Sequence, residues 1–555
     1  MQLKGAQILI EVLKEQGVDT VFGYPGGAVL DIYDALYKAS EDIHHVITCH
    51  EQGAAHAADG YARATGKTGV VIATSGPGAT NLVTGIANAY LDSVPMVAIT
   101  GNVAVSLIGR DSFQEVDIIG VTMPITKHNY IVKDVHALAE TMREAFRLAA
   151  SGRPGPVLVD IPKDVQQGLS EYTKKKPQPR NGKRKAPQQQ LEHARDLIAQ
   201  SERPFIYAGG GVVSSGATEA LIRFAEALSA PVGSSVMGLS GMPHRHPLFL
   251  GMTGMHGRFA ANKAVAGCDL LIAVGSRFSD RATGNKLSFA NGKKILHLDI
   301  DAAEISKNIP AYASLVGDVK ETLEALLEMG VARKQSSWRD EIQELVETPD
   351  NHLSMDASRL NPQMVIEALY AKVADDTPVA TDVGQHQMWT AQYYKFQKPR
   401  TFLTSGGLGT MGFGMGAAIG ACMGTGKRTL LVTSDGCFHM NMMELATAVT
   451  NNLPLVIVLM NNSVLGMVRQ WQALFYDKRY SSTTMDGRVT DYVKLAEAFG
   501  ATGLRLEHKE QLDRVLDQAL ATNGPVLIDV LIDRDEKVLP MIPPGGTIDQ
   551  IILRG

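Results

Sequence analysis

Two oxygen-bearing side chains, Asp435 and Asn462, stand 27 residues apart, and each follows a run that is typical of a buried strand. A carboxylate and an amide oxygen suit Mg²⁺, which fills its remaining positions with water and substrate phosphate oxygens. The pair therefore predicts a metal site that binds a diphosphate. The same residues also fit an ordinary βαβ unit, because Asp-Gly pairs are common in turns.

The elements around this pair must bring its two side chains together. Apolar runs predict strands over 429–433 and 454–460, and helical spacing predicts a helix over 440–450. A right-handed crossover makes two such strands parallel, and adjacent strands would place their carboxyl ends about 5 Å apart. That edge is where α/β sheets bind ligands. Asp435 and Asn462 are expected to meet there.

Length and composition point to a large globular protein. The 555 residues are enough for three or four domains, and 45% apolar and 20% charged residues are ordinary values. The net charge of −5 gives no field that attracts nucleic acid. Basic residues cluster at 174–176 with Arg180 and 183–185, but among prolines and glutamines, which favours a solvated linker over nucleic-acid binding.

Cysteine usage and the N-terminus indicate the compartment. The four cysteines, Cys49, Cys268, Cys422 and Cys437, are far apart and form no Cys-x-x-Cys pair, so neither a disulfide framework nor a zinc site is predicted. No apolar run approaches the ~20 residues that span a bilayer. The chain starts directly with an amphipathic helix instead of a targeting segment. We expect a cytoplasmic enzyme without membrane or nucleic-acid partners.

Strands and helices alternate along the chain, which predicts an α/β protein with three doubly wound parallel-sheet domains. We expect domains over 1–170, 190–330 and 360–535 and a Pro-Gly tail over 536–555 that covers another part of the molecule. A polar segment over 332–358 is expected to close the second domain. The first and third domains have similar element orders.

Three further motifs are weak when taken singly. Glu51 follows a predicted strand and faces the ligand-binding edge, although a glutamate there more often complements a helix dipole. The glycine-rich stretches 75–81 and 211–216 lack the third glycine of a dinucleotide fingerprint and the lysine of a phosphate loop, respectively. The stretch 406–420 allows close backbone approach to a ligand or to another helix, and we expect helix packing for 414–420.

Together these motifs resemble those of thiamin-diphosphate-dependent enzymes. Asp435-Gly436 followed 27 residues later by Asn462 resembles the metal and diphosphate motif, with Ser434 in place of its first glycine. Glu51 followed by Gly-Tyr-Ala-Arg at 60–63 resembles the segment whose glutamate touches the aminopyrimidine. The whole chain resembles catalytic subunits of the acetohydroxyacid (acetolactate) synthase family, through segments 23–27, 111–117, 151–164, 254–257 and 466–471. It departs from that family at Ser279, Asn102 and Ala104.

The resemblance implies a reaction and its cofactors. Two pyruvates would condense to 2-acetolactate, or pyruvate and 2-ketobutyrate to 2-aceto-2-hydroxybutyrate, with loss of CO₂. This is the first common step of valine, leucine and isoleucine biosynthesis. The implied cofactors are thiamin diphosphate, Mg²⁺ and FAD, with the first domain binding the pyrimidine, the central domain FAD and the third the diphosphate.

The resemblance also implies roles for individual residues. Mg²⁺ is bound by Asp435, Asn462 and the Val464 carbonyl, and substrate by Trp471, Arg277 and Met255. The implied catalytic residues are Glu51, Phe113, Gln114, Lys163 and Met411. The implied thiamin-diphosphate contacts are Val383, Gly384, Gln385, His386, Gly409, Met411, Gly436, Cys437, Leu465, Gly466 and Met467. The implied FAD contacts are Arg153, Gly209, Gly210, Met255, His256, Gly275, Arg277, Arg281, Asp299, Ile300 and Asp318.

In this family the first and third domains of different subunits face each other, which implies a homodimer or homotetramer. A small regulatory subunit is a further implied partner. Three alternatives remain: a flavin-dependent pyruvate oxidase, a catabolic acetolactate synthase, and a catalytically silent regulatory or binding subunit. The presence of Glu51, Asp435 and Asn462 argues against the last.

Overall fold

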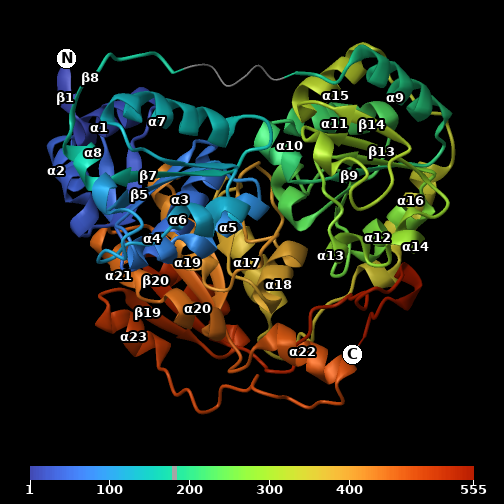
Figure 1. Ribbon diagram of the computed structural model, residues 1–555. Coiled ribbons are helices and arrows are strands. Elements are labelled where there is room, and N and C mark those ends of the chain that lie inside the picture. The colour runs from blue at the N-terminus through green and yellow to red at the C-terminus, as the bar shows by residue number, and fades with distance from the viewer. Residues whose placement is uncertain (178–183, 555) are drawn as a thin grey trace.

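The computed structural model describes residues 1–177 and 184–554 and has three α/β domains, each built on a six-stranded parallel sheet (Figure 1). The fold class predicted from the sequence is confirmed. Most strands are buried along nearly their whole length, because helices cover both faces of each sheet. Two residues of the predicted basic linker, Arg180 and Lys183, lie outside the described residues.

The first domain has the strand order β3-β2-β4-β5-β7-β6. Its strands are β2 (Thr20–Tyr24), β3 (His44–Ile47), β4 (Gly69–Ala73), β5 (Met96–Asn102), β6 (His128–Ile131) and β7 (Pro156–Pro162). Its helices are α1 (Gly5–Glu15), α2 (Leu30–Lys38), α3 (Glu51–Thr65), α4 (Pro77–Asn81), α5 (Val83–Leu91), α6 (Ile118–Thr122), α7 (Val135–Ala150) and α8 (Lys163–Gln167). A small antiparallel ribbon pairs β1 (Gln2–Lys4) with β8 (Leu169–Glu171).

The second domain has the strand order β11-β10-β9-β12-β13-β14. Numbered within the domain, this is 3-2-1-4-5-6, the order of dinucleotide-binding sheets. Its strands are β9 (Pro204–Ala208), β10 (Val232–Ser234), β11 (Phe249–Met252), β12 (Leu270–Val274), β13 (Lys294–Asp299) and β14 (Ala313–Val316). Its helices are α9 (Gln188–Gln200), α10 (Gly210–Ser215), α11 (Thr218–Leu228), α12 (Phe259–Gly267), α13 (Asp280–Thr283), α14 (Lys286–Ala290), α15 (Val319–Glu328) and α16 (Trp338–Glu347).

The third domain, β16-β15-β17-β18-β20-β19, repeats the order of the first, as the sequence predicts. Its strands are β15 (Val379–Thr381), β16 (Phe402–Leu403), β17 (Thr429–Ser434), β18 (Leu455–Asn461), β19 (Thr502–Leu506) and β20 (Val526–Leu531). Its helices are α17 (Pro362–Lys372), α18 (Gln385–Tyr393), α19 (Phe413–Thr425), α20 (Asp435–Asn441), α21 (Glu444–Thr450), α22 (Gly466–Phe475), α23 (Tyr492–Ala498) and α24 (Leu512–Ala521).

The first and third domains are joined by direct contact between α3 and α19, which lie side by side in Figure 1. A Cβ added to Gly60 would lie 2.1 Å from the Ala417 carbonyl oxygen, and one on Gly420 would lie 1.9 Å from that of Ala57. The two backbones therefore approach as closely as only glycine permits. Helix packing, the expectation for 414–420, is confirmed.

One expectation about an element needs correction, and two other stretches carry helices that the sequence analysis did not predict. The helix predicted over 440–450 is two helices, α20 and α21, joined at residues 442–443 by a turn in which Leu445 N–H donates to the Met442 carbonyl and Ala446 N–H to that of Met443. The stretch 211–216 forms most of a short helix, α10. The polar segment 332–358 carries α16, whose buried Trp338 donates to the Pro204 carbonyl at 3.0 Å and so extends the second domain.

The C-terminal tail runs from the third domain back to the second (Figure 1). Ile542 N–H donates to the Met255 carbonyl at 2.8 Å, and Asn285 N–H donates to the Gly546 carbonyl at 3.2 Å. The tail thus covers the segment around Met255. No helix in the described ranges is long and apolar enough to cross a membrane.

Candidate active site

Asp435 and Asn462 are brought to one edge of the third sheet by two neighbouring strands. β17 pairs in parallel with β18, with Ser434 opposite Met460. Asp435 is the first residue of α20, directly after β17, and Asn462 directly follows β18. The adjacent parallel strands required by the sequence argument are present.

The carboxylate of Asp435 is unusual because it is buried and one of its oxygens, Oδ1, has no hydrogen-bond partner among the described residues. Burial raises the pKa of Asp435 to about 7, although hydrogen bonds from the N–H groups of Gly436 and Ser463 lower this pKa in part. A buried unpaired acceptor costs roughly 1–3 kcal/mol. A cation at this position would remove that cost.

The turn after β18 supplies further oxygen atoms. Ser463 has a left-handed backbone with φ of 55°, and the Asn462 side-chain oxygen accepts a hydrogen bond from Val464 N–H at 3.3 Å. A Cβ on Gly436 would lie 2.9 Å from the Leu465 side chain, so this turn lies against the start of α20. Among the described residues no three acidic, histidine or cysteine side chains cluster as a metal cage. The donor set of one carboxylate, one amide and backbone carbonyls suits Mg²⁺, which keeps positions open for phosphate and water.

Neighbouring loops are tied to this edge through Asp382, which the sequence analysis did not single out. Its carboxylate accepts hydrogen bonds from Gly412 N–H at 2.7 Å and Gly414 N–H at 3.3 Å. Burial raises the pKa of Asp382 to about 6. The Cys437 thiol donates to the Val383 carbonyl at 3.1 Å. The loops that carry Val383 and Met411 are thereby fixed beside α20.

Two predicted cofactor contacts on α18 are buried within the domain. Gln385 donates to Gln470 at 3.0 Å and to the Glu536 carbonyl at 2.7 Å, and it touches Asn462 from below. A Cβ on Gly466 would lie 2.0 Å from the Gln385 side-chain oxygen. Burial lowers the pKa of His386 to about 3, so its ring is neutral. Gln385 thus contacts a predicted metal ligand, whereas His386 is packed inside the domain.

A cavity of about 1820 Å³ opens where the three domains meet. Its walls include most of the residues that the resemblance implies for FAD and substrate. These are Arg153, Gly210, Met255, His256, Gly275, Arg277, Arg281, Asp299, Ile300, Asp318 and Trp471, joined by Val383, Gly384, Gly409 and Met467 of the third domain. Gly209 lies behind the wall, since its Cβ would fall 2.1 Å from the Gly275 carbonyl oxygen.

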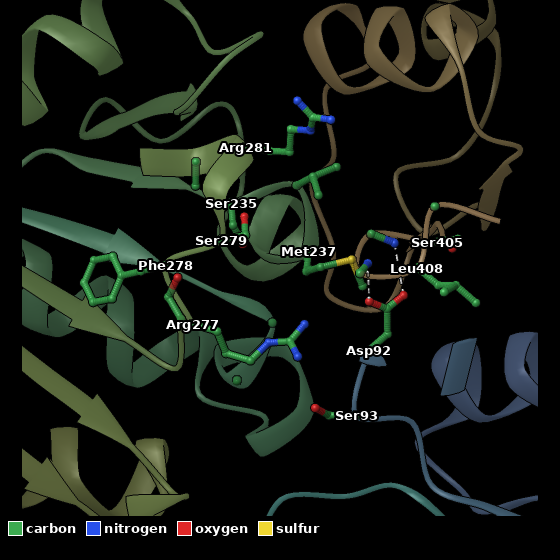
Figure 2. A pocket seen from close by; sticks show the side chains of 18 of the residues that line it. Asp92, Ser93, Ser235, Met237, Arg277, Phe278, Ser279, Arg281, Ser405 and Leu408 are labelled. Atoms are coloured by element: carbon green, nitrogen blue, oxygen red, sulfur yellow. Dashed lines mark hydrogen bonds between the residues drawn. The ribbon is translucent and has the colours of Figure 1, made fainter. Parts of the chain in front are cut away.

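Charged and aromatic side chains shape this cavity. The Arg281 guanidinium lies over the Trp471 ring, 5.3 Å from its centroid. The Arg153 guanidinium donates hydrogen bonds to the Ser93 hydroxyl at 2.8 Å and to the Glu304 carboxylate at 2.6 Å. Burial raises the pKa of Asp299 to about 6. In Figure 2 the Arg277 side chain extends from the second domain toward Asp92 and Ser93 of the first.

Asp92 is a second residue that the sequence analysis missed. Its carboxylate accepts hydrogen bonds from the backbone N–H groups of Gly406 at 3.0 Å and Gly407 at 2.7 Å (Figure 2). It is also paired with the buried Arg63 at 2.9 Å. The first domain thus holds the loop that leads to Gly409.

The remaining predicted catalytic residues lie on the first domain. Glu51 is buried and accepts a hydrogen bond from Asn81 at 2.9 Å. The Gln114 backbone, in a left-handed conformation with φ of 58°, lies within 3 Å of where a Gly76 Cβ would be. Lys163 donates to the Gly27 carbonyl at 3.3 Å, and Phe113 is 87% exposed.

The candidate residues therefore do not form one continuous lining. Glu51, Phe113, Gln114 and Lys163 do not line the cavity, and none of them contacts Asp435 within the described part of the chain. A third missed residue, Glu444 of α21, is a buried third-domain carboxylate that accepts from the N–H groups of Cys49 and His50.

Comparisons with known proteins agree with the division of the chain into three α/β domains. Three family descriptions match the chain: thiamine pyrophosphate enzyme, N-terminal TPP binding domain (residues 3–121), central domain (191–326) and C-terminal TPP binding domain (382–530). The chain is 47% identical to a probable acetolactate synthase large subunit of Methanocaldococcus jannaschii, over 99% of this chain and 95% of the relative. It is 46% identical to the acetolactate synthase isozyme 2 large subunit of Escherichia coli, over 99% of each, and 44% identical to the Buchnera aphidicola large subunit, over 100% and 99%.

Proposed function

Because this chain belongs to the acetolactate synthase large-subunit family of thiamine pyrophosphate enzymes, we propose that it condenses two pyruvates to 2-acetolactate with release of CO₂. With 2-ketobutyrate as acceptor the product is 2-aceto-2-hydroxybutyrate. The pathway served is branched-chain amino acid biosynthesis. The observation that carries the proposal is the buried Asp435 carboxylate with its unpaired oxygen, placed beside Asn462 at the ends of paired strands.

The residues at this edge fit a metal-bound diphosphate. Asp435, Asn462 and the Val464 carbonyl would hold Mg²⁺, and Gly436, Cys437 and the start of α22 would border the diphosphate. The N-terminus of α20 adds a favourable partial positive charge for that anion. When bound, thiamin diphosphate supplies the electron sink for the carbanion left by decarboxylation.

The protein's own groups position the cofactor and handle protons. Glu51 would hold a proton on the aminopyrimidine, and the Gly409 carbonyl would accept from its amino group. Met411 would pack against the rings of the cofactor and hold them in place for proton transfer. The hydrogen bond from Asn81 fixes the Glu51 carboxylate for this task.

The cavity supplies the substrate site. Arg277 and Arg281 carry the positive charge that a 2-keto acid carboxylate requires, and Trp471 and Met255 provide apolar walls for its side chain. Gln114, Lys163 and Phe113 would complete the site from a first domain.

We further propose that the second domain binds FAD. Its strand order is that of dinucleotide-binding sheets. Gly209 and Gly211 bring their segment into contact with the segment around Gly275 at the strand ends, and Gly211 and Gly275 line the cavity there. The flavin performs no redox step in this reaction. Ser279, which lines the cavity, is the departure from the family pattern.

The separation of Glu51 from the cavity supports an assembly of at least two chains, in which the first domain of one faces the third domain of the other. We propose a homodimer or homotetramer. The relatives are named large subunits, which supports a small regulatory subunit as partner. All four cysteines are free thiols, in keeping with the cytoplasmic location that we propose.

The test is an acetolactate assay run in an oxygen electrode. The protein is supplied with pyruvate, thiamin diphosphate, Mg²⁺ and FAD. Acetolactate should accumulate without oxygen uptake. A flavin-dependent pyruvate oxidase would instead consume oxygen and form no acetolactate.

A further inference from the structure

Glu444 is the first residue of α21 and is completely buried between the third and first domains. Its Oε1 accepts hydrogen bonds from Cys49 N–H at 3.1 Å and His50 N–H at 3.0 Å. Its Oε2 accepts from Cys49 N–H at 3.1 Å and from the Thr447 hydroxyl at 2.6 Å. Every acceptor position of this carboxylate is directed at the segment that leads into α3 or at its own helix.

This segment determines where Glu51 lies. His50 is the N-cap of α3, with its ring accepting from Gln52 N–H, and Glu51 is the next residue. The other side of the carboxylate faces Gly53, where an added Cβ would lie 2.3 Å from Oε1. Glu444 therefore contacts the chain both immediately before and two residues after Glu51.

We propose that Glu444 is a positioning residue for Glu51: hydrogen bonds from the third domain to the Cys49 and His50 amides set the start of α3, and with it the direction of the Glu51 carboxylate. The inference rests on the proposed role of Glu51. It adds to that role a third-domain residue that touches neither cofactor nor substrate. In Figure 1, α21 lies against the blue first domain.

The contacts define what a substitution must preserve. A glutamine at position 444 can keep its oxygen on the Cys49 and His50 N–H groups and donate its amide to the Thr447 hydroxyl. It loses only the second bond from Cys49 N–H, so both backbone N–H groups keep an acceptor and the start of α3 is retained. An alanine removes all these bonds and leaves two buried N–H groups without acceptors, and a displacement of about 1 Å at a reacting group can cost roughly 10²-fold in rate.

The experiment compares Glu444→Gln and Glu444→Ala in the full-length protein loaded with thiamin diphosphate and Mg²⁺. Hydrogen–deuterium exchange at the cofactor C2 position, kcat, KM for pyruvate and cofactor affinity are measured. Glu444→Ala should slow exchange and kcat by about 10–10²-fold, with KM and cofactor affinity within about threefold of wild type. Glu444→Gln should stay within about threefold in all four values, since the side-chain oxygen still accepts from both backbone N–H groups.

Asn451→Ala is the matched control. Asn451 caps the other end of α21 through a 2.8 Å bond to the Thr447 carbonyl and should leave exchange unchanged. In Gly53→Ala, the added methyl group on α3 would displace the Glu444 carboxylate, because its Cβ would lie 2.3 Å from Oε1. This variant should therefore slow exchange as Glu444→Ala does. It also decides the question if Glu444→Ala does not fold.

Normal exchange in Glu444→Ala, or equal loss in Glu444→Gln and Glu444→Ala, overturns the positioning role. The second result would mean that the charge matters and not the geometry. Failure of the proposed function gives a different pattern, because the wild-type protein would then form no acetolactate at all.

Discussion

At Asp435, one buried oxygen atom has no hydrogen-bond partner among the described residues, which favours a ligand-binding role over that of an ordinary turn residue. The neighbouring strand end offers a contrast. Asp529 of β20 is also buried, but its carboxylate accepts from Asn461 at 2.9 Å and is paired with Arg505 at 3.3 Å. Two aspartates of similar burial on one sheet thus differ in whether other protein groups provide partners for their carboxylate oxygens.

Asp435→Ala should abolish binding of thiamin diphosphate with Mg²⁺, because the diphosphate loses its bridge to the protein. The loss should exceed the roughly 10–100-fold that removal of an outer-shell partner costs a metal site. Cofactor titration followed by intrinsic fluorescence measures it, with Asp529→Asn as the control that keeps binding. An unchanged titration curve for Asp435→Ala would refute the metal assignment.

Glu51→Gln should leave the cofactor bound but slow proton exchange at its C2 position. The variant keeps the length of the side chain and loses the proton-holding group, a loss that typically costs about 10²–10⁴-fold. Exchange is followed by NMR after acid quench, and the cofactor titration serves as the control. Exchange at the wild-type rate would remove Glu51 from the mechanism.

Trp471→Leu should reduce the preference for 2-ketobutyrate over pyruvate as acceptor while acetolactate formation from pyruvate alone is largely kept. One methylene is worth ~1–3 kcal/mol in an apolar pocket. Competition assays with both keto acids measure the product ratio. Phe475→Leu is the control, since Phe475 stacks edge-on against Trp471 at 5.9 Å but does not line the cavity. An unaltered ratio in Trp471→Leu would place selectivity elsewhere.

At the scale of elements, the strands that carry Asp435 and Asn462 were predictable, because continuous apolar runs report burial on both faces. The break between α20 and α21 was not. The sequence shows no break there, because neither Met442 nor Met443 is a helix-breaking residue. The turn is accompanied by tertiary contacts instead: Asn441 donates to the Gly412 carbonyl, and Glu444 accepts a hydrogen bond from His50 N–H of the first domain. Glu444 and Asp92 were missed for the same reason, since their partners lie more than 300 residues away in sequence.

Asp92→Ala should loosen the loop 406–409 at the cavity wall. The change removes the acceptor of two backbone N–H groups and one partner of the buried Arg63. Hydrogen bonds to a charged group are worth about 1.5–3 kcal/mol each, so cofactor affinity should fall ten- to a hundredfold. The titration that checks this uses Asp376→Ala as control, because Asp376 forms only an exposed pair with Lys427. Wild-type affinity in Asp92→Ala would show that the loop is held without it.

At the scale of the whole molecule, the sequence predicts the three-domain plan and the similar element orders of the first and third domains, since the order of elements along the chain is written in local patterns. The matching strand orders of the two sheets come from the structure. The separation of Glu51 from Asp435 depends on how the domains pack. Helices α3 and α19 interdigitate within one chain, yet no contact among the described residues joins Glu51 to Asp435, and this observation supports the proposed assembly of at least two chains.

The most direct test of the account is the stoichiometry of pyruvate consumption under argon. The protein is supplied with thiamin diphosphate, Mg²⁺, FAD and [2-¹³C]pyruvate, and products are followed by ¹³C NMR while released CO₂ is measured. The account predicts one 2-acetolactate and one CO₂ for every two pyruvates consumed. Conversion of pyruvate to acetate or acetaldehyde, or no consumption in the presence of bound cofactor, would contradict it.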